Sequence, residues 1–222
     1  MVRLDLTSEA TPAPALRAAP EVSKPTLVSV GTGLAVAGLV LISPPTDRLP
    51  LFVGAAGYLL FAIESDVRCL RIPNWLNATG LVLALGLAGG LGGMAGIGGA
   101  LLGAGVALAI GFALFALGIL GAGDAKGLTV LGALFGLSAF PGVLSWTVLV
   151  AGALGIALLL VRGEILDFLQ RWWLMALALL VTRKPTYVAP AAGSAAATGL
   201  PFAVAMGLGT AANSAWGAPW AL

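Results

Sequence analysis

Long uninterrupted runs of apolar residues, separated by short polar or charged breaks, make up most of this chain. A helix needs about 20 apolar residues to cross the hydrocarbon core of a bilayer, within a range of roughly 17–25. The runs are too continuous for the alternating strands of a membrane barrel. The pattern therefore predicts an all-α, polytopic transmembrane helix bundle of about six to seven spans, at residues 27–43, 50–65, 75–91, 96–121, 126–140, 142–161 and 198–216.

Three segments depart from this pattern. Residues 1–26 are rich in Pro, Ala, Ser and charge, which predicts a flexible cytoplasmic tail before a transmembrane domain at 27–222. Residues 164–181 have a polar first half and a short apolar second half, so we interpret them as an amphipathic helix at the cytoplasmic membrane interface. Residues 185–197 contain Pro and Gly and are predicted to form a loop.

The composition supports a membrane protein and narrows its chemistry. Hydrophobic residues make up 59% of the chain and charged residues only 9%, against about 45–50% and about 25% in soluble domains. The chain has no histidine and one cysteine, which excludes a Ser-His-Asp triad, a Cys-His pair and a His-ligated or multi-cysteine zinc site. We expect no metal and no organic cofactor, and we expect the lipid bilayer, not nucleic acid, as a partner.

The basic residues predict the orientation of the bundle. If the N-terminus is cytoplasmic and the seven spans alternate, only Arg48 of the 11 basic residues lies outside. Such a bias is the positive-inside rule. The cytoplasmic set is Arg3, Arg17, Lys24, Arg68, Arg71, Lys126, Arg162, Arg171, Arg183 and Lys184.

Two acidic residues are the candidate chemical groups. Asp66 ends the second predicted span and Asp124 lies between the fourth and fifth, so both fall at the cytoplasmic boundary. Position alone is also compatible with ordinary solvated loop residues. Asp124, however, follows Gly121 and Gly123, and glycines permit backbone angles that other residues avoid and close approach by another backbone. A tight helix-helix turn would explain the same glycines.

The residues that follow the two acids in the sequence have structural interpretations as well. Pro73, after Ile72, cannot continue the preceding helix. Asn74 is expected to cap the next helix, with substrate positioning as the other interpretation. Lys126 either biases the two carboxyl groups electrostatically or is one more positive-inside residue.

Together the two strings resemble the prepilin peptidase (type IV leader peptidase) family, a group of membrane aspartyl proteases with a GxGD motif. That family has an Asp shortly before an Ile-Pro-Asn turn and a second Asp in a Gly-x-Gly-Asp-x-Lys motif. The chain carries Asp66 before Ile72-Pro73-Asn74, and Gly121-x-Gly123-Asp124-x-Lys126. Leu200-Pro201-Phe202 resembles a third family feature, a Pro before an aromatic residue. The cysteine-rich cytoplasmic insert of long members is missing, so the resemblance is to the short form, and N-methyltransferase activity is not expected.

The resemblance implies an aspartic endopeptidase of the inner membrane that serves a type IV pilus or a related filament. Its partner would be a prepilin or pilin-like precursor, cleaved after a basic leader at the cytoplasmic boundary. Asp66 and Asp124 would share one proton and activate a water, because two close carboxylates cannot both ionise cheaply. Gly121, Gly123, Lys126, Pro73 and Asn74 would support the site. A presenilin-like intramembrane protease and a small transporter that uses the two acids as ion sites are the alternatives.

Overall fold

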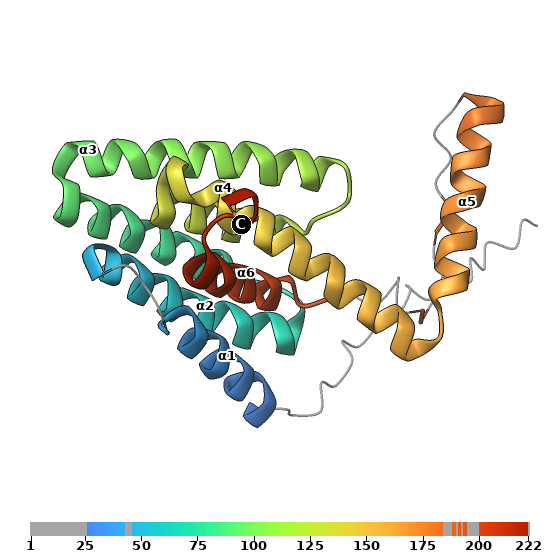
Figure 1. The fold of residues 1–222 in the computed structure, drawn as a ribbon, viewed down its shortest axis with the longest axis horizontal. Coiled ribbons are helices and arrows are strands. Elements are labelled where there is room, and N and C mark those ends of the chain that lie inside the picture. The colour runs from blue at the N-terminus through green and yellow to red at the C-terminus, as the bar shows by residue number, and fades with distance from the viewer. Residues whose placement is uncertain are drawn as a thin grey trace, which may run out of the picture.

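The computed structural model describes residues 26–42, 46–183, 188–189, 191, 193–194 and 200–221, and this part of the chain is helical, without strands (Figure 1). Four of its helices are long and apolar enough to cross a membrane: α2, α3, α4 and α5. The prediction of an all-α membrane protein is confirmed. The described α-helices are α1 (Thr26–Val40), α2 (Leu49–Cys69), α3 (Asn74–Ala116), α4 (Ala122–Arg162), α5 (Ile165–Thr182) and α6 (Phe202–Trp216), and the short 3-10 helices are η1 (Thr46–Arg48) and η2 (Pro219–Ala221).

Each of the two longest helices, α3 and α4, bends at one glycine. Gly93 has φ 56° and ψ −143°, and Gly136 has φ 64° and ψ 178°. Side chains make these conformations very costly, so glycine is required at both bends. Figure 1 shows α3 doubling back at its bend. The predicted spans 75–91 and 96–121 thus form the two arms of α3, and 126–140 and 142–161 those of α4. The second break is at Gly136, not beside Pro141, which lies inside the helix.

The helix ends differ from the predicted span ends by several residues. Helix α2 continues to Cys69, so Asp66 lies in its last turn and not in a loop. Helix α4 begins at Ala122, which puts Asp124 in its first turn. Helix α3 stops at Ala116, earlier than predicted. Hydropathy indicates where the apolar part of a span ends, whereas backbone hydrogen bonds can continue the helix into more polar surroundings. The end of an apolar run and the end of its helix therefore need not coincide.

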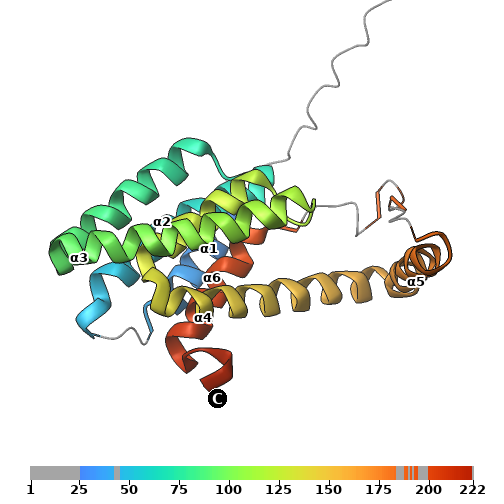
Figure 2. The same ribbon diagram turned by 90° about the horizontal axis from the view of Figure 1, so that it is seen from above.

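The remaining segments match their predicted ranges only in part. Helix α1 ends at Val40 and α6 begins at Phe202, which shortens the predicted spans 27–43 and 198–216. Helix α5 lies within a residue of the predicted 164–181, buries none of its residues and stands away from the bundle (Figures 1 and 2). It is also long and apolar enough to span a membrane, so its interfacial location stays a prediction. Residues 1–25 of the predicted tail at 1–26 and most of the predicted loop at 185–197 lie outside the described residues, and Thr26 is the first residue of α1.

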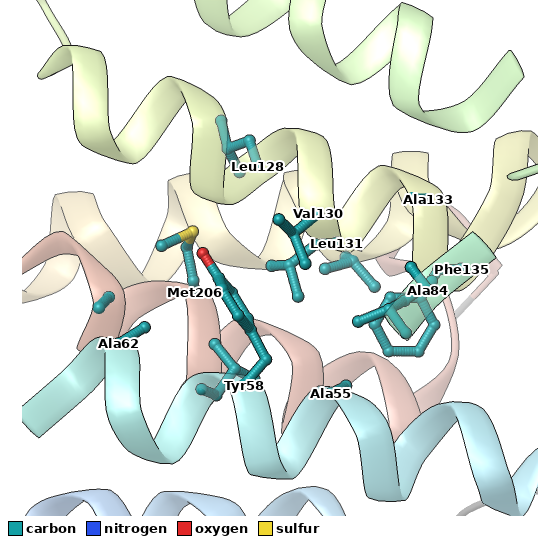
Figure 3. Close-up of a cluster of buried hydrophobic side chains, with 14 of the residues drawn as sticks. Ala55, Tyr58, Ala62, Ala84, Leu128, Val130, Leu131, Ala133, Phe135 and Met206 are labelled. Atoms are coloured by element: carbon teal, nitrogen blue, oxygen red, sulfur yellow. The ribbon is translucent and has the colours of Figure 1, made fainter. Parts of the chain in front are cut away.

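Small residues let the helices of the bundle approach closely. The packing between α3 and α4 is the most extensive in the molecule. At one crossing, a Cβ atom on Gly132 would lie 2.5 Å from the carbonyl oxygen of Gly103. In a membrane, close approach of this kind supplies the van der Waals contact that holds helices together. The core continues between α2, α4 and α6, where Tyr58, Leu131 and Met206 are buried together (Figure 3).

Different residues lie at the junction of the helix ends and around the glycine bends. At one end, hydrogen bonds join the start of α3 to the start of α4 and the last turn of α2 to the first turn of α6, and Gly123 of α4 contacts Ile72, just after α2. Elsewhere a cavity of about 370 Å³ is lined by Arg48, Gly92 and Gly136. The glycine bends therefore lie near Arg48, and both predicted acids lie at the junction of the four helix ends.

Candidate active site

Asp66 is buried at the junction of α2 and α6. It is 3% exposed, and its Oδ2 accepts a hydrogen bond of 2.8 Å from the backbone N–H of Ala203. The N–H of Phe202 is a second backbone donor. These groups belong to the first turn of α6, where backbone N–H groups have no partner within the helix and the helix dipole attracts a carboxylate. The start of α6 thus fixes the Asp66 carboxyl group.

Asp124 is the third residue of α4 and folds back over the start of its own helix. Its carboxyl group accepts from the backbone N–H of Gly121, the N-cap residue. This is one half of a capping box, in which an acidic N3 residue satisfies the N-cap donor. A Cβ atom on Gly121 would lie 2.8 Å from Asp124 Oδ2. Gly121 therefore leaves the space that the carboxyl group occupies.

The fold brings the two carboxyl groups together from separate helices. Asp66 lies within electrostatic range of Asp124, and both lie within electrostatic range of the hydroxyl group of Tyr58. Asp124 is half-buried, whereas Asp66 is buried. Among the described residues, no three His, Cys, Asp or Glu side chains gather as a metal site. The arrangement is thus a pair of carboxyl groups in partly dehydrated surroundings.

Gly123 packs the Gly121-x-Gly123-Asp124 motif directly onto the Ile72-Pro73-Asn74 turn. A Cβ atom on Gly123 would lie 3.2 Å from the carbonyl oxygen and 3.4 Å from the nitrogen of Ile72. Pro73 follows and is the N-cap of α3. Neither motif glycine has a positive φ, and Gly121 has φ −73° and ψ 151°, which other residues adopt readily. The expectation that these glycines supply unusual backbone angles is wrong; they permit close approach.

Asn74 does not cap α3. It is the first residue of that helix, after the N-cap Pro73, and no side-chain capping bond is formed. Its Oδ1 accepts a 2.8 Å hydrogen bond from the Nζ of Lys126 instead. The capping interpretation is wrong because Asn74 lies one position too late in the turn. Lys126 is thereby bonded to an amide of α3, and neither ion pair among the described residues joins it to a carboxyl group.

Two polar residues of the site were missed by the sequence analysis. The hydroxyl group of Tyr58 donates a 2.7 Å hydrogen bond to Asn77 Oδ1. The Nδ2 of Asn77 donates to the carbonyl oxygen of Gly123 at 3.3 Å. The available signal was the presence of a Tyr and an Asn within apolar runs, since polar groups in a membrane span need a partner. The backbone donors at Phe202 and Ala203 carry no such signal.

Part of the chain matches a known protein family. Residues 53–156 match the type IV leader peptidase family. Neither a curated protein nor a solved structure matches the chain. The matched range contains Asp66, the Ile72-Pro73-Asn74 turn and Asp124, and it excludes the Leu200-Pro201-Phe202 string. The family consists of aspartic peptidases of the cytoplasmic membrane, and membership implies cleavage of prepilin leaders. The chain therefore carries a type IV leader peptidase family domain over residues 53–156.

Proposed function

We propose that this protein is a membrane aspartyl endopeptidase that removes the leader from prepilin-like precursors, with Asp66 and Asp124 as its catalytic pair. One observation carries the proposal. The two motifs pack on each other through Gly123 and Ile72, with the two carboxyl groups within electrostatic range of each other. Family membership supplies the substrate class.

The chemistry needs one ionised and one protonated carboxyl group. Two carboxylates this close share a proton, because the second ionisation is opposed by the first charge. A water held between them attacks the scissile carbonyl carbon as the ionised Asp takes a proton from that water. The protonated Asp gives its proton to the carbonyl oxygen. The C–N bond then breaks as the Asp that took the water's proton gives it to the leaving amine, and the other Asp takes back a proton from a hydroxyl group of the tetrahedral intermediate as the new carboxyl group forms.

We further propose that the site faces the cytoplasm. The distribution of basic residues favours a cytoplasmic N-terminus, and Arg68, Arg71 and Lys126 flank the two acids in the sequence. A precursor with a basic leader and an apolar helix would leave its leader in the cytoplasm. Its scissile bond would then lie at the inner boundary of the membrane, beside the carboxyl pair. Helix α5 would lie along the interface.

The test is cleavage by the purified full-length chain in liposomes, with a precursor that bears a leader. Asp66→Asn and Asp124→Asn keep the size of each side chain and remove its acid, and each is expected to abolish cleavage at the leader junction. Asp47→Asn is the matched control, because Asp47 lies in η1 at the cavity lined by the glycine bends, and it is expected to cleave normally.

Three results would count against the proposal. Normal processing by either site variant would remove that residue from the catalytic pair. Cleavage within the membrane helix of the precursor, and not at its leader, would favour a presenilin-like protease. An ion flux that both variants abolish, without any cleavage by the wild type, would favour a transporter.

A further inference from the structure

We propose that Tyr58 and Asn77 are positioning residues that hold the Gly123–Asp124 segment in register with Asp66. The proposal rests on the function proposed above. Tyr58 lies on α2, two turns before Asp66, and Asn77 lies in the first turns of α3. The two side chains connect the helix that carries one acid to the helix that carries the other.

The connection is a continuous chain of two hydrogen bonds, one buried and one partly buried. Tyr58 donates to Asn77 Oδ1 at 2.7 Å, and Asn77 Nδ2 donates to Gly123 O at 3.3 Å. Both side chains are buried, at 3% and 5% exposure. Gly123 immediately precedes Asp124, so the chain ends on the peptide that leads into the acid.

The ring of Tyr58 is closely packed against the neighbouring helices. A Cβ atom on Gly80 of α3 would lie 2.8 Å from the ring, and one on Gly127 of α4 would lie 3.0 Å from the hydroxyl oxygen. Figure 3 shows the side chain extending from α2 toward Met206. The glycines on both neighbouring helices make room for a tyrosine at this position. This packing holds the hydroxyl group at hydrogen-bonding distance from Asn77.

A bridge of this kind has a direct consequence for a two-carboxyl site. The two acids come from different helices, and each helix contributes only one of them, so their separation depends on how α2 and α4 are held. In buried surroundings an unpaired amide or hydroxyl group is costly, which gives the bridge one preferred geometry. The capping bond to Gly121 orients the Asp124 side chain, whereas the bridge sets the position of the backbone that carries it.

The experiment measures kcat and KM for leader cleavage by the full-length chain in liposomes. Tyr58→Phe removes one hydroxyl group and keeps the ring, and Asn77→Leu removes both bonds of the amide. We expect Tyr58→Phe to lower kcat roughly tenfold and to leave KM within about twofold, because the lost hydroxyl group is bonded to Asn77 inside the protein. Asn77→Leu should lower kcat at least as much.

The double variant separates a bridge from two independent packing effects. If both residues act as one chain, the double variant loses no more than Asn77→Leu alone. Thr147→Val is the matched control: it removes a buried hydroxyl group with a 2.8 Å bond to Val143 O within α4, away from the acids. Its kcat should equal that of the wild type. Asn77→Asp, which keeps the acceptor for Tyr58 and loses the donor to Gly123, replaces Asn77→Leu if that variant does not fold.

The proposal is overturned by any of three results. These are a wild-type kcat for Tyr58→Phe, losses that multiply in the double variant, or a change confined to KM. A normal Tyr58→Phe beside inactive Asp66→Asn overturns the bridge alone. Cleavage by Asp66→Asn overturns the proposed function itself.

Discussion

The space beside Asp124 gives a sharp prediction for Gly121→Ala. Gly121 has φ −73° and ψ 151°, which alanine adopts without strain. The added Cβ atom would lie 2.8 Å from Asp124 Oδ2, whereas ordinary contact begins at 3.4 Å, so the oxygen must retreat by about 0.6 Å. The substitution therefore moves a carboxyl group and leaves the backbone in place.

The expected effects on rate and on stability differ in size. A misplacement of about 1 Å can cost about a hundredfold in rate. We expect kcat for leader cleavage to fall by roughly tenfold to a hundredfold, which raises the activation barrier by about 1.4–2.7 kcal/mol. The free energy of unfolding should fall by no more than about 1 kcal/mol, because the clash is with the end of a side chain and alanine is only a poorer N-cap residue than glycine.

The assay is single-turnover cleavage of a leader-bearing precursor in liposomes, with thermal unfolding of the same preparations in detergent. Gly105→Ala is the matched control, because a Cβ atom at Gly105 would meet nothing within 4 Å. It should cleave at the wild-type rate. A wild-type rate for Gly121→Ala would show that Gly121 does not set the carboxyl position. A loss of rate that only accompanies unfolding would also contradict the reasoning.

Two further predictions test the packing and the role of the cation. Gly103→Ala should destabilise the protein by about 1–3 kcal/mol or more, because its Cβ atom would lie 2.1 Å from Gly132 O. Gly105→Ala in the same helix should be neutral or stabilising by up to about 1 kcal/mol. Equal thermal unfolding of the two variants would refute the close crossing of α3 and α4. Lys126→Met should change kcat by less than about fivefold, the effect of 1 kcal/mol. It should also leave the pH profile of cleavage unchanged, because the ammonium group is bonded to Asn74. A shifted pH profile would mean that Lys126 acts on the carboxyl pair.

The carboxyl pair and the tyrosine bridge illustrate what a sequence can and cannot disclose. The two acids stand in short strings with characteristic neighbours, and the apolar runs predict that both strings lie on one side of the membrane. Tyr58 and Asn77 have no such neighbours. Neither position by itself identifies a partner, and only packing shows that they bond to each other.

The sequence by itself determined the helical class, the approximate course of the helices and the two acids, because hydropathy and short motifs are local properties. Only the tertiary structure decided that α3 and α4 bend at Gly93 and Gly136, that Asn74 holds Lys126, and that the start of α6 binds Asp66. These features join residues far apart in the chain. Their partners are chosen by how closely the helices pack, and that closeness is a property of the whole bundle.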